Sequence, residues 1–158
     1  MSNTIGIATT DNMQKYENYR EQFKRLNKAF DYKFYMEAIF IEYAIMEDRA
    51  EAILRYEGNE IKPKNEQEFI SISRKLNRIE KIAEQKKSLP EKYFSDGIAK
   101  NISEWVKQRN SLIHALLKKE LTTEEVETFA LEGKKLARAL SNKAKNYKNA
   151  VARKEAKL

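Results

Sequence analysis

Hydrophobic residues recur every three or four positions along most of the chain, which is the spacing of one face of an α-helix. The main interruptions are Gly58, Pro63 and the segment Ser88–Asp96, which contains Pro90. Glycine and proline interrupt helices, so these positions divide the chain into long helical blocks. The pattern predicts an all-α fold, an up-and-down bundle of about five helices with short connections.

Capping residues and apolar stripes give the expected bounds of these helices. Helices are expected from Asp11, with Gln14 as its capping-box partner, to about Phe30; from Tyr32 to Tyr56; from a cap at Asn65 and Glu68 through Phe69 to Ile82; from about Asp96 to Lys118; and from a capping box at Thr122 and Glu125 to Val151. The second helix is apolar almost all round, so we expect it at the centre of the bundle. The segment before the fourth helix, "SLPEKYFSDG", is expected to be irregular or a short turn of helix.

Composition agrees with this picture. A chain of 158 residues is about one domain long, so we expect a single domain over residues 1–158. Four Gly, two Pro and 35% charged residues fit a soluble helical protein better than a β-rich one. The absence of Cys excludes disulfides and thiolate metal sites, and a lone His with no Glu-x-x-His pair argues against a zinc or di-iron site. We therefore expect no metal and no cofactor.

The amino-terminal sequence, "MSNTIGIATTDN", has no basic start followed by a long apolar run. It therefore has the pattern of neither a secretory signal nor a membrane anchor. A cytoplasmic protein is the simplest expectation.

The net charge of +7 is concentrated at the carboxyl end, in the predicted basic helix from about residue 122 onward. The segment 134–158 holds nine Lys or Arg and one Glu, a net charge of +8. Such a segment can attract RNA, DNA or an acidic partner, because Lys and Arg contacts to phosphates release counterions. The alternative is a solvated helical end that keeps the protein soluble.

The segment "EWVKQRNSLIHALLKK", residues 104–119, places Arg109 near the middle of the apolar arc of its helix. A guanidinium does not lose its proton, so burial without a partner costs several kcal/mol. The central helix offers Glu47 at one margin of its apolar arc, Glu42 at the opposite margin and Asp48 facing more outward. Either Arg109 forms a structural ion pair with a carboxylate, or it lines a cleft that receives a phosphate.

Asn110 and His114 lie together at the edge of the same arc. A single His is often an edge-of-core imidazole with one hydrogen bond. Beside an arginine and an amide on one side of one helix, however, it completes a set suited to phosphodiester chemistry. General acid-base cleavage needs two proton-transfer groups, and a second copy of the helix across a twofold axis would supply the other imidazole.

The segment "RNSLIH", Arg109 to His114, resembles the signature of HEPN domains, in which an Arg precedes a His by four to six residues and a polar residue, here Asn110, often follows the Arg. The layout is also similar: a helical bundle of about 150 residues with the motif on the fourth long helix and one helix after it. The resemblance covers the whole chain in layout and six residues in motif.

This resemblance implies a metal-independent endoribonuclease that works as a homodimer. The RNA 2′-hydroxyl would attack the adjacent phosphorus, which gives a 2′,3′-cyclic phosphate and a 5′-hydroxyl. Arg109 would hold the phosphate, His114 would transfer protons, and Asn110 would orient either the phosphate or His114. From the helical geometry alone, Glu47 or Asp48 would position Arg109.

The resemblance further implies a toxin or a phage-defence effector, with RNA as substrate and an antitoxin or regulatory protein as a further partner. Toxins paired with a minimal nucleotidyltransferase often carry Tyr two residues after the His, and this chain has Leu116 there. Abortive-infection HEPN proteins are therefore the nearer comparison. The alternative is a non-catalytic helical module that binds RNA or a protein through the basic end and the aromatic residues of the first two helices.

Overall fold

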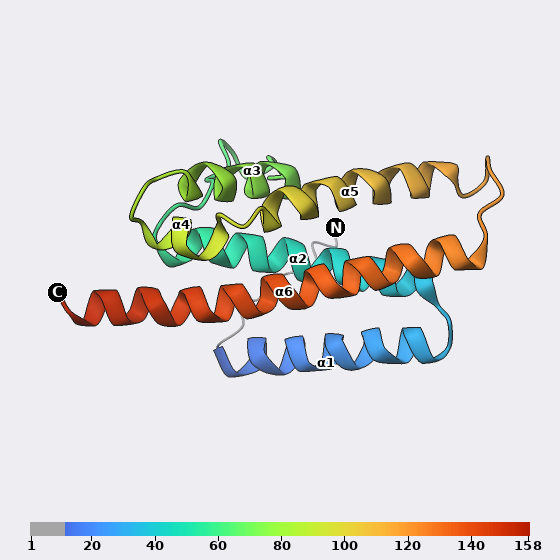
Figure 1. Ribbon diagram of the computed structural model, residues 1–158, viewed down its shortest axis with the longest axis horizontal. Helices are drawn as coiled ribbons and strands as arrows, with labels where there is room; N and C mark the ends of the chain where they lie inside the picture. Colours follow the sequence, from blue (N-terminus) through green and yellow to red (C-terminus); the bar gives the residue numbers. More distant parts are fainter. Residues whose placement is uncertain (1–11) are drawn as a thin grey trace, which may run out of the picture.

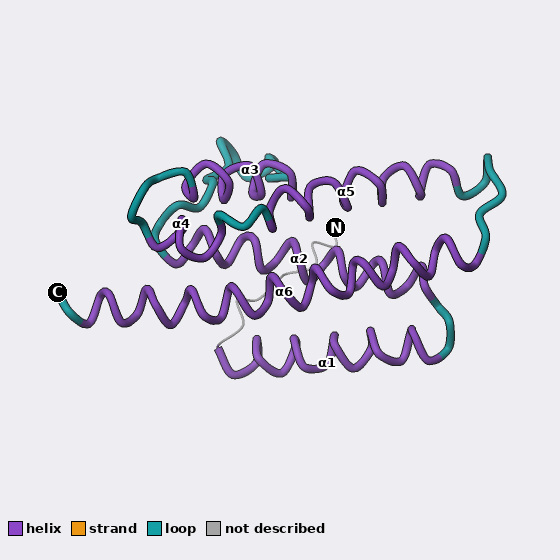
Figure 2. Tube along the Cα trace, viewed as in Figure 1, coloured by secondary structure: helices purple, strands orange, loops and turns teal. Residues whose placement is uncertain are grey.

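The computed structural model describes residues 12–158, and within this range the chain forms six helices and no strand. The all-α bundle expected from the sequence is confirmed, with the short segment before the fourth long helix forming a helical turn of its own (Figure 1 and Figure 2). The helices are α1 (Asn12–Asp31), α2 (Tyr35–Tyr56), α3 (Ile72–Ala83), α4 (Leu89–Phe94), α5 (Ile98–Ala115) and α6 (Thr123–Ala156).

The two central helices, α2 and α6, run side by side in the same direction, with α1 on one side of the pair and α5 on the other (Figure 1). Half of the residues of α2 are buried, which confirms the central position expected from its sequence. Trp105, Ile102 and Ile98 anchor the first half of α5 in the core. The carboxyl end of α6 extends beyond the rest of the bundle (Figure 1).

An aromatic cluster fixes the second half of α6. The ring of Tyr147 meets Phe94 edge-on at 5.0 Å and lies 6.1 Å from the ring of Tyr56. Its hydroxyl donates a hydrogen bond of 2.8 Å to Glu57, and burial raises the pKa of Tyr147. One side chain therefore ties α6 to α4 and to the end of α2.

The third helix begins later than the sequence predicts. Asn65 accepts a hydrogen bond from the backbone N–H of Gln67, and Glu68 accepts one from the N–H of Lys64, but these contacts close a turn that does not continue as a helix. The true N-cap is Ser71, which accepts from the N–H of Arg74. The expected cap at Asn65 is wrong, and Phe69, expected on the apolar stripe, is 73% exposed.

Tertiary packing sets the residue at which α3 begins. The segment after α2 lies along the bundle and buries Ile70, so the chain enters the core one residue before Ser71 and the helix starts there. The second helix likewise begins at Tyr35 rather than Tyr32, because Lys33 adopts a positive φ of 60° that no helix accommodates.

The capping box expected at Thr122 and Glu125 is confirmed, with both of its hydrogen bonds formed. The expected start at Asp11 lies outside the described residues.

Gly133 marks the closest approach of α6 to its neighbours. A Cβ at this position would lie 2.6 Å and 2.8 Å from two ring atoms of Trp105 and against the carboxyl of Glu42. The indole cannot retreat easily, because it stacks on Phe129 at 4.8 Å and its Nε1 donates to the Phe129 carbonyl. Only glycine permits this packing.

We therefore expect Gly133→Ala to lower the free energy of unfolding by about 1–3 kcal/mol, even though alanine is the better helix former by about 1 kcal/mol. Urea denaturation measures the change. The matched control is Glu132→Ala, at the exposed neighbouring position, which should stay within about 0.5 kcal/mol of the parent. An alanine variant at 133 that is as stable as the parent would contradict the described packing.

Within residues 12–158 no helix is both long enough and apolar enough to cross a membrane.

Candidate phosphate site on helix α5

The second half of α5 leaves the core. Its buried residues end at Val106, and every later position of the helix is half-buried or exposed. Arg109, Asn110 and His114 therefore stand on a helical end that is anchored by Trp105 but open to solvent. Apolar residues on the same end are also uncovered: Ile113 is 40% exposed and Leu117, just past the helix, is fully exposed.

Arg109 meets an aromatic ring and not a carboxylate. Its guanidinium carbon lies 4.1 Å from the centre of the Tyr43 ring of α2, a cation–π contact. Nη1 donates a hydrogen bond of 3.1 Å to the side-chain oxygen of Asn110. Nε is buried and has no hydrogen-bond partner. The guanidinium is thus held by its face, while most of its donors have no acceptor and its charge meets no carboxylate among the described residues.

The ion pair expected between Arg109 and Glu47 or Asp48 is not formed in the described part of the chain. Glu47 lies 3.4 Å from the ammonium of Lys75 on α3. Asp48 pairs with Arg49 at 3.1 Å. The physical reason is where the side chains meet: Arg109 of α5 reaches Tyr43 of α2, one turn before Glu47, and Glu47 pairs with Lys75 of α3 instead.

Asp48 belongs to a separate network on the α1 side of α2. It accepts a hydrogen bond from the hydroxyl of Tyr19 and lies 3.5 Å from Lys15. Burial alone would raise the pKa of Asp48, but the hydrogen bonds from Tyr19 and Arg49 outweigh it and leave the pKa lowered. The carboxylate is therefore committed to α1 and cannot serve Arg109.

His114 is exposed and forms no hydrogen bond or ion pair within residues 13–158. It lies one turn after Asn110 on the same side of α5, where side chains four apart are neighbours. The structure thus brings Arg109, Asn110 and Tyr43 into direct contact and leaves both nitrogens of His114 free for other partners.

Tyr43 is the residue that sequence reasoning missed. Burial raises the pKa of its hydroxyl, Glu47 raises it further, and Arg109 lowers it, which places Tyr43 between the two charges. A tyrosine one turn before Glu47 on the central helix was the available signal, because residues four apart share a helical face.

Glu42 is the second unforeseen feature. It is fully buried beside Gly133 and Trp105, and neither carboxyl oxygen has a hydrogen-bond partner. Burial raises its pKa to about 9, against a smaller opposing effect of Lys134. The side chain is therefore neutral at pH 7 and cannot balance the charge of Arg109.

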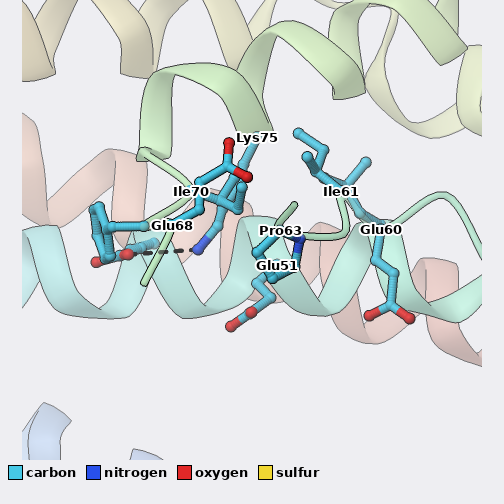
Figure 3. Close-up of a pocket in the computed structure, with 10 residues that line it drawn as sticks. Glu51, Glu60, Ile61, Pro63, Glu68, Ile70 and Lys75 are labelled. Carbon is cyan, nitrogen blue, oxygen red and sulfur yellow. Dashed lines mark hydrogen bonds and ion pairs between the residues drawn. The ribbon is translucent and has the colours of Figure 1, made fainter. Parts of the chain in front are cut away.

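A cavity of about 310 Å³ lies between α2, α3 and the segment that joins them (Figure 3). Four carboxylates line it, and Lys75 is the cation among them; the carboxylates are those of Glu47, Glu51, Glu60 and Glu68. Its acidic lining would repel a phosphate, and it contains none of the residues of the α5 motif.

Comparison of the chain with protein-family models, with curated proteins and with solved structures found no significant match.

Proposed function

We propose that the protein is a metal-independent endoribonuclease of the HEPN type that acts as a homodimer and serves as a toxin or phage-defence effector. The observation that carries the proposal is Arg109: a half-buried guanidinium, stacked on Tyr43, with no carboxylate partner in residues 13–158 and with Asn110 and His114 on the same exposed helical end.

Two features of Arg109 favour a phosphate as its missing partner. The stack on Tyr43 fixes the plane of the guanidinium, and a fixed plane can present two parallel N–H groups to two phosphate oxygens. Apart from the Nη1 bond to Asn110, the guanidinium has no hydrogen-bond acceptor within residues 13–158, and phosphate oxygens would supply acceptors to its Nη groups. Asn110 supports the same plane from the side.

The uncovered apolar residues support a second copy of the chain as the dimer partner. Ile113 of α5 and Leu116, just past its end, are about two-fifths exposed, and Phe40, one turn before Tyr43 on α2, is 67% exposed. An apolar patch of this kind beside a polar cluster is typical of a protein interface. A twofold axis through it would place two Arg109–His114 pairs on one cleft.

In that cleft one His114 imidazole would accept the proton of the RNA 2′-hydroxyl as its oxygen attacks the adjacent phosphorus. The second imidazole, protonated, would give a proton to the departing 5′-oxygen as the P–O5′ bond breaks. Arg109 would stabilise the negative charge that builds on the phosphate oxygens. The products are a 2′,3′-cyclic phosphate and a 5′-hydroxyl, and no metal takes part.

The purified protein is therefore expected to cleave RNA in the presence of EDTA. Fragments should carry 2′,3′-cyclic phosphate ends, which resist direct ligation and tailing, and 5′-hydroxyl ends that polynucleotide kinase labels without prior dephosphorylation. Pools of tRNA, rRNA and mRNA should be tested in parallel. Cleavage that requires Mg²⁺, or fragments with 3′-hydroxyl ends, would refute the proposed mechanism.

A further inference from the structure

A groove of about 420 Å³ runs between α1 and α6, on the side of the bundle away from α5 (Figure 1). Long side chains bridge the two helices: the guanidinium of Arg138 lies 5.3 Å from the ring of Phe23, and the ammonium of Lys134 lies 4.7 Å from the ring of Phe30. These contacts link α1 to α6, and the first of them, between Arg138 and Phe23, lies in the lining of the groove.

The lining of the groove is cationic and aromatic. Arg20 and Lys24 of α1 face Arg138 of α6 across it, and Asn27 closes one end. Among the described residues no carboxylate lines it; the acidic residues of this part of α1, Glu17 and Glu21, are not in its lining. Three lining cations create a local positive potential that attracts polyanions.

Tyr16 and Tyr19 line the other end. Tyr16 is 65% exposed, so its ring is open to a stacking partner. Tyr19 is held in place by the guanidinium of Arg49, 3.9 Å from its ring centre. Asp48, which accepts a hydrogen bond from Tyr19, is already paired with Arg49 and Lys15, so these three charged groups together carry one net positive charge.

The positive surface continues along α6. Because α1 and α6 run in opposite directions, the Tyr16 end of the groove points toward the carboxyl half of α6 (Figure 1). Lys145 is exposed seven residues, or two helical turns, after Arg138, so it lies on nearly the same side of the helix about 10 Å further on. Arg153, near the carboxyl end of α6, is also exposed. This end of the helix extends beyond the rest of the bundle (Figure 1).

From these observations we propose that the α1–α6 groove is a binding site for single-stranded nucleic acid, with Arg20, Lys24 and Arg138 on the phosphates and a base stacked on Tyr16. Basic grooves lined with exposed aromatic rings are the usual means of holding a single strand without sequence preference. An acidic protein would pair with the cations but would bring no base to stack on the ring of Tyr16. Binding at this groove does not depend on RNA cleavage at the α5 site, so the proposal goes beyond the proposed ribonuclease.

The test measures binding of a fluorescein-labelled oligothymidylate DNA by fluorescence anisotropy. This probe lacks the 2′-hydroxyl, so the proposed ribonuclease cannot consume it. The variant Arg20→Gln/Lys24→Gln should weaken binding by about tenfold or more and should flatten the salt dependence, since each lost phosphate contact removes about 0.7 from the slope of log K against log salt. Tyr16→Ala should weaken binding by about tenfold, and Tyr16→Phe should bind as the parent does.

The matched control is Lys81→Gln/Lys86→Gln, which removes the same charge from exposed positions on and just after α3. It should change affinity by less than about twofold, because it leaves every phosphate contact in place. Circular dichroism checks that all variants remain helical. Equal weakening by both double variants would show that only net charge matters, and no binding by the parent would also overturn the site.

Two further outcomes separate the alternatives. If Tyr16→Ala has no effect, or polyglutamate displaces the probe as readily as unlabelled oligothymidylate does, the groove is a general polyanion or acidic-protein site and the assignment is wrong. If the parent protein cleaves no RNA, and only the groove variant loses binding of the probe, the nucleic-acid site is supported and the proposed ribonuclease is rejected.

Discussion

His114→Ala should lower the rate of RNA cleavage by about a hundredfold to ten-thousandfold, because general acid-base catalysis by a positioned imidazole contributes this much. The same variant should fold normally. His114 is exposed and has no partner within the described residues, so its loss should change the free energy of unfolding by less than about 0.5 kcal/mol. Single-turnover cleavage of a defined RNA and urea denaturation measure the two effects.

Arg109→Lys tests whether cleavage needs the planar guanidinium of Arg109 or only its positive charge. Lysine keeps the charge but lacks the planar fork that stacks on Tyr43 and donates to Asn110. Cleavage should therefore fall despite the retained charge. Lys100→Ala is the matched control, since Lys100 is exposed near the start of α5, nine residues before Arg109 and on the opposite side of the helix from it, and should not affect the rate. Normal cleavage by His114→Ala would reject the catalytic assignment.

Mixtures of parent and His114→Ala chains test the shared cleft. If one dimer needs two imidazoles, one as base and one as acid, a mixed dimer is inactive, and activity should fall with the square of the parent fraction after the chains are unfolded and refolded together. A linear fall would mean that each chain works alone. The oligomeric state of each mixture, measured by light scattering, must be the same for the comparison to hold.

Local sequence signals identified those elements whose partners are close in the chain. The capping box at Thr122 and Glu125 formed as expected, because its two hydrogen bonds join residues three apart. Asn65 carried an equally good local signal and was wrong, because burial of Ile70 fixed where the chain enters the core and Ser71 was placed to cap the helix. Competition between two caps is decided by tertiary packing.

The candidate site shows the same limit. Helical spacing placed Arg109 and Asn110 next to each other on α5, and the hydrogen bond between them agrees, since that is a property of one helix. It could not say whether Arg109 meets Tyr43 or Glu47, because these residues lie one turn apart on the same side of α2 and only tertiary packing decides between them. Nor could it foresee the burial of Glu42, which depends on Gly133 of α6.

Glu42 should make the fold strongly sensitive to pH. Burial without a hydrogen-bond partner raises its pKa to about 9 in the folded protein, from an ordinary value of 4.5. Between these values the folded chain holds a proton that the unfolded chain releases, so the free energy of unfolding falls as the pH rises. One such group changes it by up to about 1.4 kcal/mol per pH unit.

Glu42→Gln should remove this dependence, because the amide has nearly the shape of the protonated acid and does not ionise. Between pH 6 and pH 8 the parent should lose about 3 kcal/mol relative to the variant, measured by urea denaturation at each pH. Subtraction of the two curves cancels every other group that titrates in this range. Parallel curves would mean that Glu42 ionises freely and that its carboxyl is not enclosed by α5 and α6.

Lys134 offers an internal check on the origin of the effect. Its charge lowers the pKa of Glu42, so Lys134→Gln should raise that pKa further and extend the loss of stability to higher pH. Lys135→Gln, the exposed neighbour, removes the same charge and should leave the pH dependence unchanged. A shift of equal size in both variants would trace the effect to net charge, whereas a shift in Lys134→Gln alone locates it at the contact of α2 with α6.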